Sequence, residues 1–352
     1  MSHQENIPSS NAMMNNIASY MPNPCPICQS NSEVAYSLET SYIVKELEKY
    51  YGEAVPDNLE ICNYNLLRCK SCSLEFASPL QSGSNQFYLW ITNHPSYYPD
   101  YRWEWDPVLE KISQSNSISK SLLEIGCGSG IFLEKTQKIP ELRAVGLDTT
   151  QASVEKCQGK NLEVYCATIE SFLTQADAPD KLFDFVVSFH CLEHVSDPKK
   201  LIQSMLLVLK PTGSIFVSTP YSPGSSETQW FDPLNHPPHH MTRWNHESYT
   251  ELAQQLGLQI NFLMPAAAKP VTRTLDALNF AWHGCKDRIS PRRMKLTALT
   301  RPISFVSEWQ RQLKRERVNN QTAADVVLVE LSRPLLEEGK PRFIDKFTYS
   351  LN

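Results

Sequence analysis

Three glycines and one aspartate form the clearest ligand-binding pattern in the sequence. Gly126, Gly128 and Gly130 lie between an apolar run and a helical run. Glycines let the backbone turn tightly there and approach a ligand without a Cβ in the way. Asp148 ends the next apolar run, where a carboxylate can accept hydrogen bonds from both hydroxyl groups of a ribose. Ile131 stands where the dinucleotide-binding motif has its third glycine, so the spacing disfavours a dinucleotide. The alternative is an ordinary tight turn.

A second group has the pattern H-x-x-E-H and consists of His190, Glu193 and His194. On a helix this pattern is typical of a zinc-dependent peptidase. Here it directly follows a predicted strand, which excludes that interpretation. Two hypotheses stay open: these side chains pack beneath a ligand, or they take part in catalysis or bind a divalent ion. His194 is the catalytic candidate, because histidine is the usual base near neutral pH.

A third group is the histidine loop, residues 235–244, which reads Asn-His-Pro-Pro-His-His-Met-Thr-Arg-Trp. Its prolines limit the entropy lost when the loop becomes ordered. Three histidines, an arginine and a tryptophan are unusual for a solvent loop, so we expect contact with a substrate. His239 and His240 are the candidate bases. The alternative is a loop whose histidines cap the helix that is predicted from Asn245.

Four cysteines fall into two Cys-x-x-Cys pairs, Cys25/Cys28 and Cys69/Cys72. Two such knuckles supply the four thiolates that tetrahedral structural zinc uses. A closed site of this kind stabilises a small domain and performs no chemistry itself. Chance pairing or redox use is the alternative. We expect the scattered cysteines to be small buried apolar residues.

Short apolar runs alternate with helical stretches from residue 121 onward, at spacings that suit βα units in a parallel sheet. The cysteine-rich segment, residues 21–80, contains a helix-like run at residues 42–51 and strand-like residues on both sides of the second knuckle. Residues 266–320 form a helical insert with 12 Lys or Arg and four Asp or Glu. This basic insert is either a solvated face or a surface that contacts phosphates or a membrane. The predicted strands lie at residues 122–125, 143–147, 183–188, 214–218, 258–263 and 325–331.

The stretch from residue 121 to 219 resembles the class I methyltransferases that use S-adenosylmethionine (SAM). The resemblance rests on several motifs in the family's order, found at residues 123–130, 145–148, 167–170, 183–198 and 209–213. It implies an α/β fold: a Rossmann-like seven-stranded sheet of order 3-2-1-4-5-7-6, with the basic insert between the sixth and seventh strands. Within that family, Leu-Glu-His after the fourth strand is common and often packs beneath the cofactor, while some members bind a divalent ion there.

The resemblance also implies where SAM would lie. Glu124 and Gly126 would face its methionine end, and Asp148 would hold its ribose. Thr168 and Ile169 would border the adenine, although an acidic residue is frequent in the family at the position of Thr168. We expect further cofactor contacts from Cys127, Gly128, Gly130, Thr149 and His190.

The chain has 352 residues, with 41% hydrophobic and 20% charged residues and a formal net charge of -5. These values are ordinary for a soluble protein and argue against one that mainly coats nucleic acid. No apolar run is long enough to span a membrane, and the N-terminal segment lacks the apolar core of a signal peptide. We therefore expect a cytoplasmic protein. The predicted segments are a disordered start (1–20), a zinc-binding module with four cysteine ligands (21–80), a linker and lead-in helix (81–110), the methyltransferase domain (111–335) and a tail (336–352).

Three functional hypotheses follow. The first is methyl transfer to a small-molecule acceptor of sugar, lipid-linked or secondary-metabolite type. The second is an RNA methyltransferase that uses the basic insert, and the third is a non-catalytic scaffold. Similar knuckles precede methyltransferase domains in sugar C-methyltransferases and in a ribosomal RNA guanine methyltransferase type, but neither match is close. Residues 21–80 carry four Lys or Arg against eight Asp or Glu, which disfavours contact with a phosphate backbone. Nucleic acid is therefore the less favoured partner, and peripheral membrane contact through the insert remains open.

Overall fold

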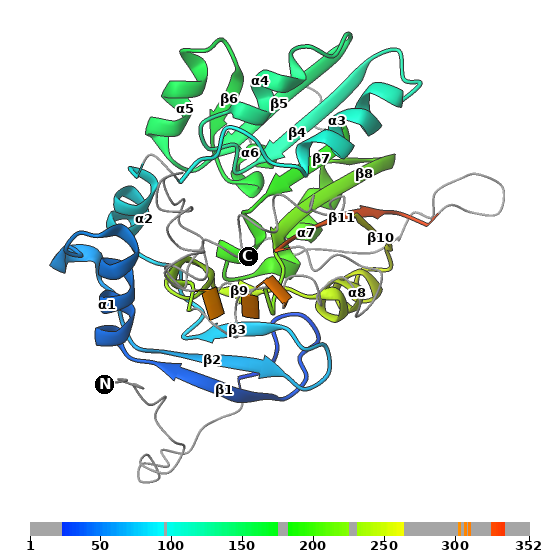
Figure 1. Ribbon diagram of the computed structural model, residues 1–352. Helices are drawn as coiled ribbons and strands as arrows, with labels where there is room; N and C mark the ends of the chain where they lie inside the picture. Colours follow the sequence, from blue (N-terminus) through cyan, green and yellow to red (C-terminus); the bar gives the residue numbers. More distant parts are fainter. Residues whose placement is uncertain are drawn as a thin grey trace.

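The computed structural model of the protein contains two β-sheets, one of seven strands and one of four, with helices around them (Figure 1). It describes residues 23–94, 97–174, 182–224, 231–263 and 325–334, together with a few positions between 302 and 310. No helix within these ranges is long and apolar enough to cross a membrane. The predicted disordered start, most of the basic insert and the C-terminal tail lie outside the described residues.

The seven-stranded sheet has the order β10-β11-β8-β7-β4-β5-β6. β4, β5, β6, β7 and β8 run parallel, whereas β11 pairs antiparallel with both β8 and β10. Numbered within the sheet, this is the predicted order 3-2-1-4-5-7-6, which the structure confirms. The strands are β4 (Lys120–Ile125), β5 (Leu142–Asp148), β6 (Glu163–Cys166), β7 (Phe183–Phe189), β8 (Leu209–Pro220), β10 (Gln259–Leu263) and β11 (Val326–Ser332).

Helices cover both faces of this sheet, which explains why its strands read as near-continuous apolar runs. Successive side chains of a strand point to opposite faces, so Leu122 and Leu123 belong to different hydrophobic clusters. One cluster includes side chains of α3 (Trp105–Gln114), α4 (Ile131–Thr136) and α5 (Gln151–Gln158). The other includes side chains of α6 (Ile169–Thr174), α7 (Pro198–Leu207) and α8 (His246–Gln255).

The four-stranded sheet has the order β1-β2-β3-β9, and its strands are antiparallel. Three strands come from the cysteine-rich segment: β1 (Ser32–Leu38), β2 (Tyr64–Cys69) and β3 (Glu75–Ser78). The fourth, β9 (Thr242–Arg243), comes from the end of the histidine loop. The hydrophobic cluster that includes side chains of α6, α7 and α8 also contains Cys25, Phe76 and Trp244 together with residues of the larger sheet. The cysteine-rich segment therefore shares a sheet and a core with the rest of the chain.

Helices α1 (Thr40–Tyr51) and α2 (Asn85–Thr92) pack on a third hydrophobic cluster, which includes Met241 of the histidine loop. Helix α2 lies inside the stretch that the sequence analysis assigns to a linker. Phe87 and Ile91, one helical turn apart, are its buried residues, and the Ser84 side chain caps its N-terminus. A serine- and asparagine-rich composition hides such a short helix.

All six apolar runs predicted as strands are strands. The predicted helix at residues 42–51 is α1, and the lead-in helix is α3. Three strands, β1, β6 and β9, were not predicted. Two of them are short, since β6 has four residues and β9 has two. The boundaries that it draws between segments stay predictions.

Replacing Arg243 by methionine tests the join between the histidine loop and the smaller sheet. The buried Arg243 guanidinium lies 2.9 Å from Glu75 Oε2 and donates to the Tyr36 hydroxyl and to Ser222 Oγ at 2.8 and 3.2 Å. Removing Arg243 leaves the buried Glu75 carboxylate with only the half-exposed Arg68 as its ionic partner, which is costly for a buried charge. We expect Arg243→Met to lower the free energy of unfolding by about 3 kcal/mol in urea titrations.

Arg68 provides the matched control, because it pairs with the same Glu75 but its side chain is 55% exposed. We expect Arg68→Met to cost less than about 1 kcal/mol. Equal losses in the two variants would contradict the assigned role of Arg243.

Candidate active site

A cavity of about 980 Å³ brings the glycine loop and the histidines together. Its wall includes the carboxyl ends of β4 and β5, where open α/β sheets bind ligands. Segments far apart in the sequence contribute the other side, among them α2, the 3₁₀ helix Leu192–His194 and the histidine loop. The cavity thus joins the three groups that the sequence analysis singled out.

The glycine loop has a backbone that only glycine adopts readily. Gly126, Gly128 and Gly130 have φ angles of 74°, 52° and 75°. A Cβ on Gly128 would lie 2.8 Å from the Tyr98 ring, so a side chain there would have to displace that ring. Asp148 fastens the loop: its Oδ2 accepts a hydrogen bond from the Gly128 N–H at 2.9 Å, and Oδ1 accepts one from the Thr150 N–H at 2.8 Å. The carboxylate is therefore held at the cavity wall.

Glu124 is buried beside this loop, and its Oε2 has no hydrogen-bond partner among the described residues. Burial, with the nearby charges of Cys157 and Asp148, raises the pKa of this carboxyl well above its ordinary value. A buried polar atom without a partner costs free energy, so such atoms are usually satisfied. Glu124 lines the cavity and can accept a hydrogen bond from a positively charged group of a ligand.

Arg102 and several aromatic residues also line the cavity, and the sequence analysis did not assign them to the site. Burial lowers the pKa of the Arg102 guanidinium, while the negative charges of Glu104 and Glu193 oppose that shift. The signal that could have revealed Arg102 and four of the aromatic residues is the concentration of Tyr and Trp around Arg102 in the stretch read as a linker and lead-in helix. The aromatic residues are Tyr50, Tyr51, Tyr88, Tyr97, Tyr98, Trp105, Phe132 and Phe189.

His190 lies at the end of β7 with a φ of 52°, a left-handed conformation that is uncommon outside glycine. Its Nε2 is 2.9 Å from Glu104 Oε1, and its Nδ1 is 3.5 Å from Glu193 Oε1. Burial and the positive charge of Arg102 would lower the pKa of His190, but its contacts with the two glutamates outweigh them and raise it. This ring bridges two buried carboxylates at the cavity wall.

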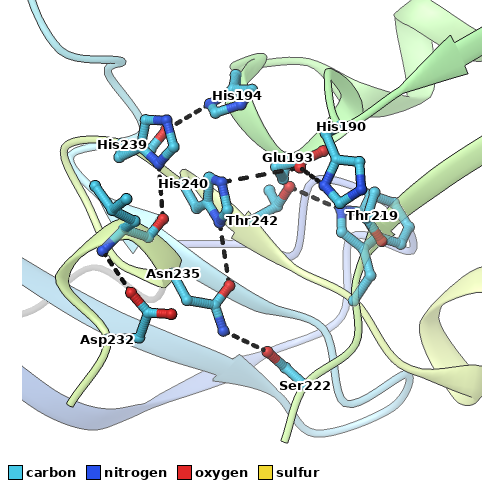
Figure 2. Close-up of polar contacts among 12 residues, drawn as sticks. His190, Glu193, His194, Thr219, Ser222, Asp232, Asn235, His239, His240 and Thr242 are labelled. Atoms are coloured by element: carbon cyan, nitrogen blue, oxygen red, sulfur yellow. Dashed lines mark hydrogen bonds and ion pairs between the residues drawn. The ribbon is translucent and has the colours of Figure 1, made fainter. Parts of the chain in front are cut away.

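His194 and His239 are joined through the backbone (Figure 2). His194 Nδ1 lies 2.7 Å from the His239 carbonyl oxygen, and His239 Nδ1 lies 2.7 Å from the Leu234 carbonyl oxygen. A carbonyl oxygen only accepts, so Nδ1 carries the proton in both rings. Nε2 then carries the lone pair in both rings, and that of His239 accepts from the Tyr97 hydroxyl at 3.0 Å.

His240 stacks on His239 with ring centroids 4.4 Å apart. Its Nδ1 donates to Asn235 Oδ1 at 3.1 Å, and its Nε2 lies 3.8 Å from Glu193 Oε1 (Figure 2). Burial and the neighbouring histidines lower the pKa of His240 well below its ordinary value, so the ring is neutral near pH 7. His240 therefore presents an Nε2 lone pair in a site shielded from water.

Two other side chains of the histidine loop, His236 and Arg243, face the smaller sheet. His236 Nδ1 donates to the Asp232 carbonyl at 2.7 Å, and its Nε2 lies 2.6 Å from the Tyr36 hydroxyl. Arg243 pairs with Glu75, as described above. The buried Trp244 packs against Tyr249, with ring centroids 4.6 Å apart. Of the three histidines in the loop, two reach the cavity and one anchors the loop.

The four predicted zinc ligands cluster at the far end of the smaller sheet. Sγ–Sγ distances are 3.6 Å for Cys25–Cys72, 3.4 Å for Cys28–Cys69 and 3.8 Å for Cys28–Cys72. Tetrahedral zinc with thiolate ligands requires sulfurs about 3.8 Å apart. This donor set fits a structural zinc ion.

All but one of the predicted catalytic and cofactor-binding residues line the cavity. Gly130 is the exception, since it caps the start of α4 behind the loop. The structure thus brings the predicted residues together, and their individual roles stay predictions. The predicted residues that line the cavity are Glu124, Gly126, Cys127, Gly128, Asp148, Thr149, Thr168, Ile169, His190, His194, His239 and His240.

A family profile described as "Methyltransferase domain" matches residues 99–261, the part of the chain that holds the glycine loop, Asp148 and the histidines. Residues 99–261 therefore match a methyltransferase domain, and the strand order of the larger sheet is that of class I SAM-dependent methyltransferases. The cavity fits SAM on two observations of its own: the bare glycine backbone of Gly126 and Gly128 at its wall, and the buried Glu124 oxygen that has no hydrogen-bond partner among the described residues.

The methyltransferase domain is similar to curated ubiquinone biosynthesis O-methyltransferases. The protein of Dictyostelium discoideum is 32% identical over 113 residues, which are 28% of this chain and 35% of that protein. The protein of Histophilus somni is 37% identical over 114 residues, which are 30% of this chain and 48% of that protein. The match thus spans less than half the length of these relatives. A solved SAM-dependent methyltransferase from Archaeoglobus fulgidus covers 70% of this chain and 100% of its own, with 17% identity and a TM-score of 0.45.

Replacing Glu124 by glutamine should change how stability depends on pH. The pKa of Glu124 is raised in the folded protein, so folding favours its protonated form. Stability from this group is present below its unfolded pKa and is lost as pH rises through the folded pKa. We expect the ligand-free Glu124→Gln variant to be more stable than the wild type at high pH, with a difference that shrinks toward low pH. Urea midpoints over a pH series measure it, and a difference that does not vary with pH would contradict this account.

Proposed function

We propose that the protein transfers a methyl group from SAM to a small-molecule acceptor bound in the cavity. The observation that carries this proposal is that one cavity contains both the groups that suit SAM and a set of buried histidines. SAM supplies an activated methyl group on a positively charged sulfur. The protein has to bind and orient the two reactants, because positioning supplies much of the rate of such a displacement.

Different residues of this chain would bind different parts of SAM. We propose that Asp148 accepts hydrogen bonds from the ribose hydroxyls and that Glu124 accepts one from the amino group of the methionine end. Arg102, which the sequence analysis missed, suits the carboxylate of that end because a guanidinium binds carboxylates well. Thr168 and Ile169, also at the cavity wall, would border the adenine. Glu124 then gains the partner that it lacks in this structure.

The acceptor would enter between the tyrosines and the histidines. An oxygen nucleophile has to lose a proton to a base. His194, His239 and His240 line this side of the cavity, and each has its Nδ1–H hydrogen-bonded to an oxygen, which leaves Nε2 as the basic atom. The aromatic wall favours an acceptor with an apolar or planar part. Relatives described as ubiquinone biosynthesis O-methyltransferases agree with an oxygen acceptor. Sugar, lipid-linked and secondary-metabolite acceptors all remain within this proposal.

We further propose that Cys25, Cys28, Cys69 and Cys72 bind a structural zinc ion. Support comes from the spacing of the four sulfurs and from backbone N–H groups of Ile27, Ser71 and Cys72 that lie 3.4 Å from cysteine sulfurs. Such a site would stabilise the smaller sheet, to which the histidine loop contributes β9. The alternative of an RNA acceptor depends on residues 266–320, which lie mostly outside the described residues, and it stays a prediction.

Calorimetric titration with S-adenosylhomocysteine (SAH), the product form of the cofactor, tests the cofactor part of the proposal. We expect the wild type to bind SAH, and Asp148→Asn to weaken binding by about 10- to 100-fold because a charged hydrogen bond is lost. Glu134→Gln is the matched control, since Glu134 pairs with Lys160 outside the cavity wall. Absent binding in the wild type, or equal affinity in Asp148→Asn, would contradict the assignment.

The acceptor class is tested with methyl-labelled SAM and cell extract, separated into small-molecule, lipid, RNA and protein fractions. Label in the small-molecule or lipid fraction is the expected result, and the labelled species then identifies the acceptor. Label confined to RNA would instead establish the alternative, and label confined to protein would contradict both.

A further inference from the structure

Three imidazole rings converge at the acceptor side of the cavity. His194, His239 and His240 can each offer one ring nitrogen so that the three nitrogens lie within 4.8 Å of one another. His194 comes from the 3₁₀ helix after β7, whereas the other two come from the histidine loop (Figure 2). One base would need only one lone pair. Three ring nitrogens this close together are what a cation requires.

The hydrogen bonds of the three rings already have the form found in metal sites. In each ring, Nδ1 donates to an oxygen: the His239 carbonyl, the Leu234 carbonyl and the Asn235 side chain, respectively. Histidine ligands of metals almost always donate their other ring N–H in this way, which fixes the tautomer and the ring orientation. The remaining Nε2 atoms are then the ligand atoms. The Tyr97 hydroxyl, 3.0 Å from His239 Nε2, would have to turn aside.

Glu193 provides an independent observation. This carboxylate is 1% exposed, and neither of its oxygens has a hydrogen-bond partner among the described residues. Its Oε1 lies 3.8 Å from His240 Nε2 and 3.5 Å from Nδ1 of His190, a ring that also contacts Glu104. A buried carboxylate is costly unless a positive charge or hydrogen bonds compensate it. A cation beside His240 would provide that charge.

We propose that His194, His239 and His240 bind a divalent transition-metal ion, with the Glu193 carboxylate beside it. Neutral imidazole nitrogens select zinc-like ions over magnesium or calcium, which prefer oxygen. Three protein ligands leave a coordination position open toward the cavity, the arrangement of catalytic rather than structural sites. The proposal rests on the proposed function, because the open position would hold an oxygen of the methyl acceptor and favour its deprotonated form.

Cobalt titration of the metal-free full-length chain distinguishes this site from the four cysteines. Thiolate ligands give intense sulfur-to-cobalt charge-transfer bands, and imidazole ligands do not. We expect the wild type to bind two equivalents of Co²⁺, one of them without thiolate bands. Asn235→Ala, which removes the acceptor of the His240 Nδ1–H, should weaken that second equivalent by about 10- to 100-fold. His240→Asn should abolish it and leave the thiolate bands intact.

His246→Asn is the matched control, because His246 is exposed and outside the cluster, and it should keep both equivalents. Thermal unfolding shows whether each variant is folded. X-ray absorption of the zinc-loaded wild type requires no variant, and we expect nitrogen as well as sulfur ligands. One equivalent with only sulfur ligands, or a second equivalent that survives in folded His240→Asn, would overturn the proposal.

SAH titration of the same preparations separates this inference from the proposed function. SAH binding without a second metal equivalent would overturn the metal site alone. A second equivalent without SAH binding would overturn the methyltransferase proposal and leave the metal site standing.

Discussion

The pairing of β9 with β3 is the contact on which the arrangement of the cavity depends. Thr242 and Arg243 pair with Phe76 and Glu75, and the Ala77 N–H donates to the Met241 carbonyl at 2.8 Å. The side chain of Arg243 adds a buried ion pair to these backbone bonds. The histidine loop therefore ends as a strand of the smaller sheet. Two further contacts hold this loop. His236 Nε2 lies 2.6 Å from the hydroxyl of Tyr36, a residue of β1, and the Gly83 N–H, just after β3, donates to the Pro238 carbonyl at 3.0 Å.

The cavity consequently has two walls of different origin. The wall of the larger sheet follows from parallel strand order, which places the glycine loop and Asp148 at adjacent strand ends. The opposite wall exists because the smaller sheet holds His239 and His240 over that edge. In this account the four cysteines act at a distance from the chemistry: they stabilise the sheet that positions the histidines. The shared hydrophobic cluster of both sheets makes that support rigid.

Local sequence patterns predicted the cofactor side of the cavity, and the resemblance to class I methyltransferases predicted the order of the larger sheet. A glycine loop, an aspartate at the next strand end and apolar runs are signals that lie within a few tens of residues. The pairing of β9 was beyond such reasoning, because a two-residue strand carries no periodicity and its partner lies more than 160 residues away in the sequence. For the same reason the loop was predicted as one substrate-facing unit, whereas His236 and Arg243 face the smaller sheet. The orientation of the Nε2 lone pairs depends on carbonyl oxygens such as that of Leu234, whose position only the fold determines.

Hydrogen–deuterium exchange of the zinc-loaded protein and of its Cys69→Ser variant tests most directly whether the smaller sheet positions the histidines. The account predicts faster exchange in the variant both in the cysteine-rich segment and in residues 236–244, with unchanged exchange at β4 and the glycine loop. Faster exchange in the cysteine-rich segment alone, with residues 236–244 unaffected, would contradict it.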